Sequence, residues 1–242
     1  MTLTNPQRRD GEPVFIPIVD ALQEEADMLD RVVSGQSQYE FLLWQTSTCL
    51  VAPRSLTGND NFKRACRLSR ESGWPIHLRG TGGDVTPQGK GVINISIAYG
   101  SPDGSGPSIK AAYERLCRPI LQALEEAGIK GDYGHVDNAF CDGAYNITIG
   151  GKKFSGTAQR WKKVKWERER FAIFSHALLL IEPPSARTID AINSFYIQCG
   201  IDREIKKNAH AGLSEQFLCW EQRDCASFLS SLRARYASDG DV

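Results

Sequence analysis

The spacing of apolar and polar positions predicts five helices along the chain. From Asp20 to Val33, apolar side chains recur every three or four residues with acidic residues between them, which indicates an amphipathic helix. The clearest periodic stretch opens at Pro107 and Ser108 and is followed by Gly128, a typical residue just past a helix end. The same spacing predicts further helices over residues 60–73, 185–199 and 214–236.

Short runs rich in β-branched and aromatic residues predict strands between these helices. Two such runs, Phe41–Trp44 and Cys49–Ala52, are expected to pair across a tight turn. A hairpin is predicted over residues 145–154, because Gly150 and Gly151 suit the positive backbone angles of a two-residue turn. Further strands are expected at 75–78, 92–97 and 174–180, and a loop at 100–106.

This order of elements predicts the fold class. Strands and helices do not alternate regularly, as they would in a parallel doubly wound sheet, so we expect an α+β fold with a mainly antiparallel or mixed β-sheet flanked by helices. With 242 residues and 41% hydrophobic content, the chain can bury one substantial core. We expect a polar N-terminal leader over 1–14 and a single catalytic domain over 15–242, with C-terminal helices from about 185.

Charge and cysteine content exclude several classes of function. The 29 basic and 29 acidic side chains balance, so neither a nucleic acid nor a membrane is expected as a partner. The polar N-terminus and the absence of an apolar run of ~18 residues predict a cytoplasmic protein. The seven cysteines are irregularly spaced without a C-x-x-C pair, so we expect mostly buried, inert thiols and no metal site.

The first segment with chemical potential is glycine-rich. Gly80, Gly82 and Gly83 follow Arg79 directly and precede Asp84, between two predicted strands. Glycines let a ligand lie directly on the backbone, where N–H groups can hold a carboxylate, phosphate or thioester oxygen. The segment matches neither a phosphate-binding loop nor a dinucleotide fingerprint, so a purely structural glycine-rich connection remains an equal alternative.

The second segment combines a thiol with a cation. Cys141 precedes the predicted hairpin, and Lys152 and Lys153 follow its turn. A thiolate is a competent acyl acceptor, and a nearby ammonium stabilises it and can supply a proton. The turn would place Lys153 opposite Thr148, which is seven residues after Cys141. A straight strand would therefore separate Cys141 from Lys153 by ~23 Å at ~3.3 Å per residue. A shared site therefore requires the chain to fold back, which Asp142-Gly143 permits; otherwise Cys141 is an ordinary structural cysteine.

Two histidines are candidate bases for such a thiol. His135 lies in a glycine-flanked loop upstream of Cys141, and a binding role and a structural role are equally open for it. His176 lies inside an apolar run, which favours a buried core residue.

At these two segments the sequence resembles the biotin/lipoate protein ligase superfamily, in particular its branch of lipoate-protein ligases and cysteine-dependent octanoyltransferases. The likeness covers roughly residues 15 to 200. It is carried by Leu78-Arg79-Gly80-Thr81-Gly82-Gly83, by Cys141-Asp142-Gly143-Ala144-Tyr145 and by Lys153-Phe154-Ser155-Gly156.

The resemblance implies an acyltransferase that moves an octanoyl or lipoyl group through a thioester on Cys141, with Lys153 contacting the acyl carbonyl and assisting proton transfer. It implies no required cofactor. The implied partners are lipoyl-domain proteins, namely the E2 subunits of 2-oxoacid dehydrogenases and the glycine-cleavage carrier protein. The implied substrate-binding residues are Arg79, Gly82, Gly83, Asp84, His135 and Gly156.

Departures from the family pattern keep two alternatives open. Related enzymes have a histidine where this chain has Gln88, and the ligases usually have a third glycine at the position of Thr81. The accessory C-terminal domain of many ligases has no counterpart before Val242, which favours a transferase. The main alternative is a lipoate-protein ligase that uses ATP and magnesium to form a lipoyl-adenylate, and the other is a protein that binds lipoate without turning it over.

Overall fold

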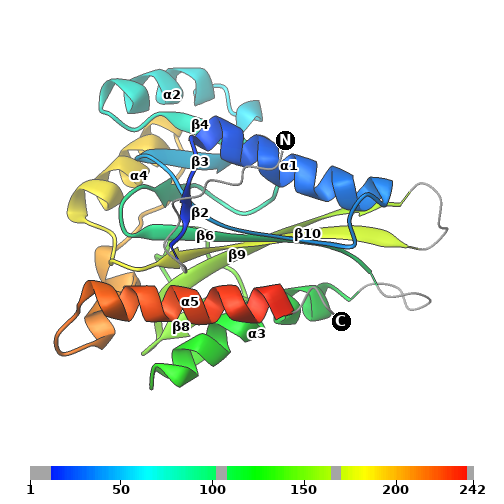
Figure 1. Ribbon diagram of the computed structural model, residues 1–242. Coiled ribbons are helices and arrows are strands. Elements are labelled where there is room, and N and C mark those ends of the chain that lie inside the picture. The colour runs from blue at the N-terminus through cyan, green and yellow to red at the C-terminus, as the bar shows by residue number, and fades with distance from the viewer. Residues whose placement is uncertain (1–11, 102–107, 165–169, 239–242) are drawn as a thin grey trace.

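Two β-sheets organise the molecule in the computed structural model, which describes residues 12–101, 108–164 and 170–238 (Figure 1). Within these residues the larger sheet has the strand order β1 (Val14–Phe15), β2 (Tyr39–Gln45), β6 (Val92–Gly100), β10 (Phe171–Leu180), β9 (Lys152–Lys163), β8 (Ile147–Ile149) and β7 (Gly131–Tyr133). The smaller sheet has the order β4 (Ile76–Arg79), β3 (Cys49–Pro53) and β5 (Thr86–Gln88).

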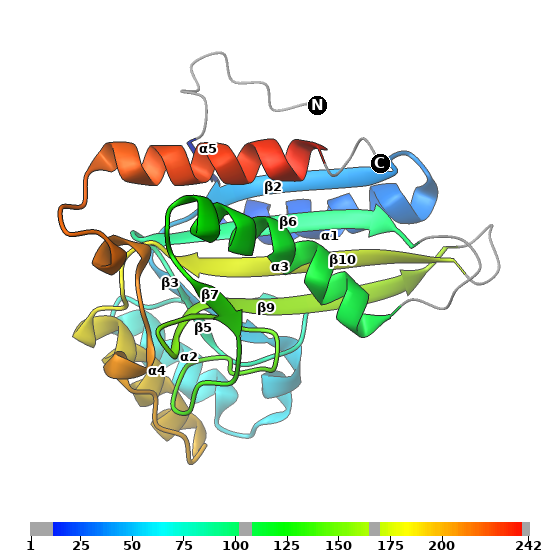
Figure 2. The same cartoon turned by 90° about the horizontal axis from the view of Figure 1, so that it is seen from below.

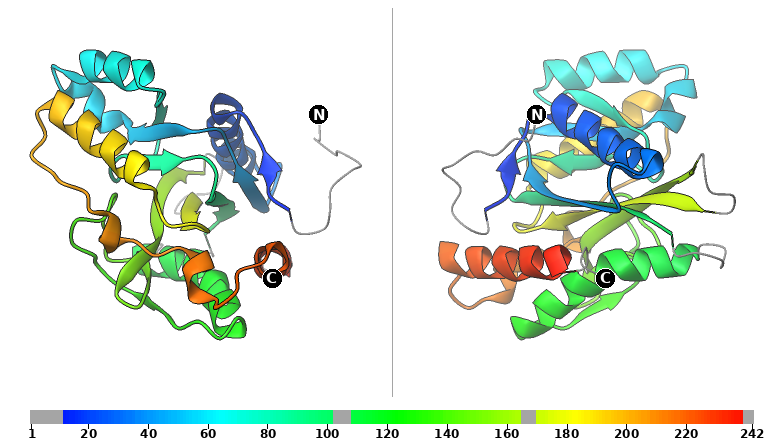
Figure 3. Two further views of the ribbon diagram at one scale, coloured as in Figure 1. Left: turned by 90° about the vertical axis from the view of Figure 1, so that its left-hand side faces the viewer. Right: turned by 45° about the vertical axis from the view of Figure 1, so that its right-hand side comes forward.

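Helices cover both faces of the larger sheet. One face carries α1 (Ile18–Ser34), and the opposite face carries α3 (Ile109–Glu126) and α5 (Gln222–Ser238), as Figure 2 shows. The smaller sheet packs against α2 (Phe62–Glu71) and α4 (Ala186–Cys199) (Figure 3). Short 3-10 turns occupy Arg54–Gly58, Lys207–Ala209 and Leu213–Gln216.

Local sequence signals explain where several of these helices begin and end. The side chains of Ser108 and Ser185 accept hydrogen bonds from the first turns of α3 and α4, and so satisfy N–H groups that lack a partner in the helix. Gly35 ends α1 in the left-handed conformation, with φ of 74°. The predicted helices therefore form close to their predicted positions, although the last one begins at Gln222 and residues 213–216 form a separate 3-10 turn.

The fold class predicted from the sequence is confirmed, with a sheet that is mixed rather than purely antiparallel. β1 pairs with β2 in parallel, and β3 with β4 in parallel, while the other strand pairs are antiparallel. The predicted hairpin forms between β8 and β9, with positive φ at Gly150 and Gly151. No helix among the described residues is long and apolar enough to cross a membrane.

The predicted pairing of the two early strands is wrong. β2 joins β6 in the larger sheet, where Leu43 pairs with Ile95, and β3 lies in the smaller sheet between β4 and β5. Every residue of β3 is buried, so this strand needs a neighbour on each edge and packing on both faces, which a two-stranded hairpin cannot supply.

Two predictions fall partly on undescribed residues. Of the predicted polar leader, residues 1–11 lie outside the described part of the chain, but Val14, its last residue, already pairs with Trp44 in the larger sheet. In the predicted loop over 100–106, Gly100 belongs to β6, and residues 102–106 lie outside the described part.

Strand alternation places polar side chains on one face of the larger sheet. In β6, Ile93, Ile95 and Ile97 pack toward α3 and α5, so the residues between them face α1. The same alternation in β10 turns His176 away from that core. The polar floor of a cavity beneath α1 is formed in this way.

Candidate active site

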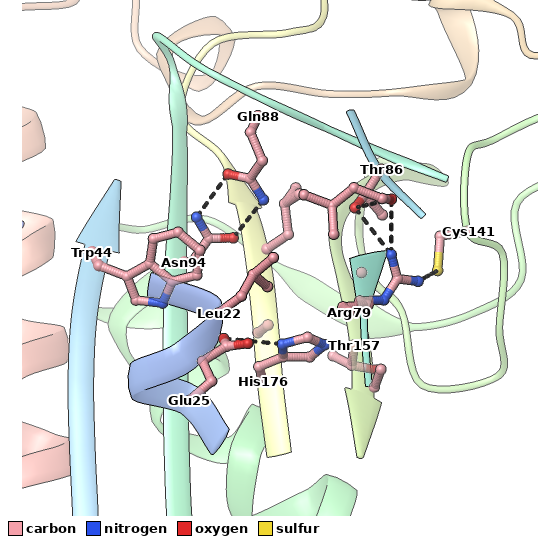
Figure 4. Close-up of a pocket in the computed structure, with 15 residues that line it drawn as sticks. Leu22, Glu25, Trp44, Arg79, Thr86, Gln88, Asn94, Cys141, Thr157 and His176 are labelled. Carbon is pink, nitrogen blue, oxygen red and sulfur yellow. Dashed lines mark hydrogen bonds and ion pairs between the residues drawn. The ribbon is translucent and has the colours of Figure 1, made fainter. Parts of the chain in front are cut away.

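A cavity lies where the two sheets meet beneath α1. Cys141 lines it together with side chains from α1 and from both sheets (Figure 4). Much of the lining is apolar and consists of Leu22, Trp44, Val51, Ala158, Ala177 and Leu178.

The sulfur of Cys141 lies against the glycine-rich loop. The main-chain N–H of Asp84 donates a hydrogen bond to Sγ at 3.3 Å, and Nη2 of Arg79 lies 3.9 Å from it. A Cβ atom added at Gly83 would lie 2.6 Å from Sγ, so only glycine permits this approach. The two segments singled out in the sequence therefore meet at one point.

Arg79 organises the glycine-rich loop from inside. The residue is 4% exposed, and its guanidinium donates to the carbonyl oxygens of Gly82 and Asp84 at 2.8 and 2.7 Å, and to that of Val51 at 2.9 Å. These contacts fix the loop that presents the Asp84 N–H to the thiol. Arg79 thus shapes the site from behind and brings a positive charge close to sulfur.

The side chain of Lys153 contacts the loop that carries Cys141, so the chain does fold back between Cys141 and the hairpin, as a shared site requires. The ammonium is fully buried and donates to the carbonyl oxygens of Phe140 and Cys141 at 2.6 and 2.5 Å. Burial lowers the pKa of Lys153 to about 8, opposed by the negative charge available at Cys141. Gly156 makes room for it, because a Cβ there would lie 3.0 Å from Nζ.

The backbone of Cys141 is held in an unusual conformation. Its φ is 47°, in the left-handed region that residues other than glycine seldom adopt. Such conformations persist only where the surrounding contacts impose them, and they are common at functional sites.

The side chain of Asp84 contributes a second link at the site. Its carboxylate pairs with Arg203, whose Nη2 also donates to the carbonyl oxygen of Ala139 at 3.2 Å. Arg203 therefore ties the glycine-rich loop to the segment that carries Cys141. No local pattern in the sequence indicates this contact.

His135 does not line the cavity, in contrast to Arg79, Cys141 and Gly156. Its ring is exposed, and Nδ1 lies 3.2 Å from Oδ2 of Asp142. Although partial burial opposes it, the N–H of Val136 and the His135 ring hold the pKa of the Asp142 carboxyl below its usual value. In this arrangement His135 supports the residue next to Cys141 and makes no contact with its sulfur.

Two polar pairs in the cavity were not expected from the sequence. His176, interpreted there as a core residue, is half-buried in the cavity wall and contacts Glu25 at 3.2 Å and Thr81 at 3.1 Å. Gln88 and Asn94 join their side-chain amides by two hydrogen bonds, at the end of the cavity away from Cys141 (Figure 4). Strand alternation is the signal that could have found them.

The seven cysteines are all free, and Cys49, Cys117, Cys141 and Cys199 are buried. Burial raises the pKa of the Cys117 thiol to about 12 and that of Cys199 to about 11, which makes both inert at neutral pH. Within residues 12–101, 108–164 and 170–238, no cluster of three or more His, Cys, Asp or Glu side chains could hold a metal ion.

Known proteins share both the sequence and the fold. The model of the lipoyl protein ligase A/B catalytic domain matches residues 17–207. The octanoyl-GcvH:protein N-octanoyltransferase of Kyrpidia tusciae is 32% identical over 200 residues, which cover 81% of this chain and 68% of that protein. The protein of the same name from Geobacillus kaustophilus is 28% identical over 186 residues, covering 75% of this chain and 62% of the relative.

Among solved structures, a crystal structure of lipoate-protein ligase A bound with ATP superposes with a TM-score of 0.62. The match covers 93% of this chain and 84% of that one. At 14% sequence identity it supports the fold alone. The family model and the first relative cover most of the chain. The chain belongs to the lipoyl protein ligase A/B catalytic-domain family.

Proposed function

We propose that this chain is an acyltransferase that moves an octanoyl or lipoyl group onto the acceptor lysine of a lipoyl domain through a thioester on Cys141. One observation carries the proposal: the sulfur of Cys141 lies at the cavity wall with the N–H of Asp84 3.3 Å away, and buried Lys153 holds the same loop. The relatives named as octanoyltransferases support an octanoyl group.

In the first half-reaction the acyl group leaves its donor. The Cys141 thiolate attacks the acyl carbonyl of an octanoyl-lysine amide, and the carbon–sulfur bond forms as the carbon–nitrogen bond breaks. The departing amine takes a proton from the Lys153 ammonium, which becomes neutral. Of the three N–H donors of Lys153, two are directed at main-chain carbonyls, which leaves one for the acyl oxygen or the amine.

In the second half-reaction the acceptor lysine attacks the thioester. A carbon–nitrogen bond forms, the carbon–sulfur bond breaks, and the thiolate of Cys141 is regenerated. The proton lost by the attacking amine returns to Lys153, so protons balance over the cycle. A pKa of about 8 suits Lys153 to both steps, because both of its protonation states are accessible near neutral pH.

The apolar part of the cavity suits the hydrocarbon chain of the acyl group. Leu22, Trp44 and Leu178 offer apolar surface, while the thioester end would lie at Cys141. The names of the relatives favour the glycine-cleavage H protein as the octanoyl donor and a second protein as the acceptor. We propose the lipoyl domains of 2-oxoacid dehydrogenase E2 subunits as these acceptors. In this scheme neither a metal nor a nucleotide is required.

Intact mass measurement after incubation with an octanoylated H protein tests the proposal. We expect the protein to gain one octanoyl group, to lose it on addition of a lipoyl domain, and to gain none after Cys141→Ala. Cys219→Ala is the matched control, because Cys219 is an exposed thiol that an unspecific donor would modify.

Transfer activity that survives Cys141→Ala would refute the thioester. A second reaction with ATP, magnesium and free lipoate tests the ligase alternative. Release of pyrophosphate together with a lipoylated domain would show a ligase activity and would contradict the proposed transferase.

A further inference from the structure

The segment 203–211, which follows α4, binds the loop before the candidate nucleophile, here called the 138–141 loop. The main-chain N–H of Lys206 donates to the carbonyl oxygen of residue 138 at 2.9 Å, and Arg203 donates to that of residue 139. The two contacts fall on neighbouring residues of the loop. The 138–141 loop therefore takes its shape from a distant part of the chain.

His210 makes the next contact in this series. Its ring is 2% exposed, and Nε2 accepts a hydrogen bond from the main-chain N–H of Phe140 at 3.2 Å. Nδ1 lies 3.0 Å from the carbonyl oxygen of Lys206, so Nδ1 carries the hydrogen and Nε2 presents a lone pair. The imidazole also stacks on the Phe140 ring, with centroids 4.5 Å apart and planes 18° from parallel.

The protonation state of His210 fits this geometry. Burial, together with the charge of Lys153, lowers the pKa of His210 to about 4, so the ring is neutral at pH 7. A protonated ring would carry a hydrogen on Nε2 and could not accept from Phe140.

Phe140 is consequently held from both sides. His210 holds its N–H, and the Lys153 ammonium holds its carbonyl oxygen at 2.6 Å. The N–H of Phe140 belongs to the peptide that precedes it and the carbonyl to the Phe140–Cys141 peptide, so the two contacts fix the peptide planes on both sides of Phe140. The second plane helps to set the backbone angle φ of Cys141, which has the unusual value of 47°. The two contacts thus impose the conformation that brings Sγ to the N–H of Asp84.

We propose that His210 is a positioning residue for the acyl transfer: through the N–H of Phe140 it keeps Cys141 in the left-handed conformation that directs its sulfur at the glycine-rich loop. The inference rests on the proposed function. His210 lies beyond the residues 17–207 that the family model matches, and it touches no atom of the reaction itself.

Two substitutions separate the hydrogen bond from the packing. His210→Phe keeps a ring to stack on Phe140 and removes the acceptor, whereas His210→Gln keeps an acceptor and removes the stacking. We expect His210→Phe to lower the rate constant of Cys141 acylation at saturating donor by about tenfold, the effect of one lost hydrogen bond, with little change in KM. His210→Gln should recover most of the rate.

Leu213→Ala is the control for general destabilisation. Leu213 is fully buried close to His210 in sequence, but it packs in the core beneath α3 and α5 rather than with Phe140 and Cys141. It should lower the unfolding temperature and leave the acylation rate unchanged. A His210→Phe protein that acylates at the wild-type rate, or a His210→Gln protein no faster than it, would overturn the proposal.

Two further measurements do not depend on acyl transfer. Alkylation of Cys141 by iodoacetamide at one fixed pH, located by peptide mass, should fall in His210→Phe even if the wild-type protein accepts no acyl group, so failure of the proposed function is recognised separately. ¹⁵N NMR of the wild-type imidazole should show unprotonated Nε2 at pH 7. A protonated Nε2 would overturn the proposal without any variant having to fold.

Discussion

The buried ammonium of Lys153 should make stability depend on pH in the alkaline range. Burial lowers its pKa from 10.5 to about 8, so the folded state holds this proton less tightly than the unfolded state does. Between these two pH values the unfolded chain binds more protons, and the free energy of unfolding therefore rises as pH rises. Below about pH 8 the full cost of burying the charge is present.

The magnitude follows from the shift. The lowering of the pKa from 10.5 to about 8 corresponds to roughly 3 kcal/mol of lost stability at pH 7, most of which is recovered by pH 10. Lys153→Met removes the titrating group and leaves two carbonyl oxygens without their donor, a cost that does not vary with pH. The difference in free energy of unfolding between wild type and variant therefore isolates the pH dependence that is due to Lys153.

Urea unfolding of both proteins at several pH values from 7 to 10 measures this difference. We expect the free energy of unfolding of the wild type to gain roughly 2–3 kcal/mol relative to that of Lys153→Met across the range. Lys152→Met is the matched control, because Lys152 is the adjacent lysine and is exposed. The difference in free energy of unfolding between wild type and Lys152→Met should not change with pH. A flat or falling difference for Lys153 would refute the reasoning, since it would mean that the two carbonyls keep the ammonium charged in spite of burial.

The glycines of the site give two further predictions. Gly83→Ala places a methyl group 2.6 Å from Sγ of Cys141 at a φ of +93°, so acylation should fall at least about tenfold and stability by roughly 1–2 kcal/mol, whereas Gly58→Ala, with nothing within 4 Å, should match wild type in both assays. Gly156→Ala places a methyl group 3.0 Å from Nζ of Lys153, so it should slow transfer and cost about 1–3 kcal/mol of stability in urea unfolding. An unchanged transfer rate would show that Lys153 can move aside without affecting the reaction.

Local sequence rules predicted the elements of the fold because local physics determines them. The amphipathic helix over α1 and the hairpin at Gly150 and Gly151 depend on residue spacing and on backbone angles, and both are as expected. The folding back of Cys141 toward Lys153 was a stated requirement of a shared site, and the structure meets it. The sequence thus stated which geometry a shared site needs, but only the structure shows that the chain adopts it.

Long-range pairing was beyond such rules. β2 and β3 are neighbours in sequence and belong to different sheets, because partner choice depended on which faces the rest of the chain would cover. Arg203 meets Asp84 across 119 residues, and His210 meets Phe140 across 70. Neither Arg203 nor His210 lies in a motif, so only the folded chain identifies them as part of the site.

The fold does not distinguish a transferase from a ligase, since a ligase structure superposes on this chain at 14% sequence identity. The distinction must lie in what the shared scaffold presents to the acyl carbonyl. Buried thiols such as Cys117 are kept protonated by apolar surroundings, whereas the sulfur of Cys141 meets the N–H of Asp84 and the guanidinium of Arg79. A cysteine that merely packed would not require left-handed backbone or a glycine cleared of its Cβ to reach those donors. Because both features bring this sulfur to those donors, the 138–141 loop, and not the sheet, is the main support for thioester chemistry.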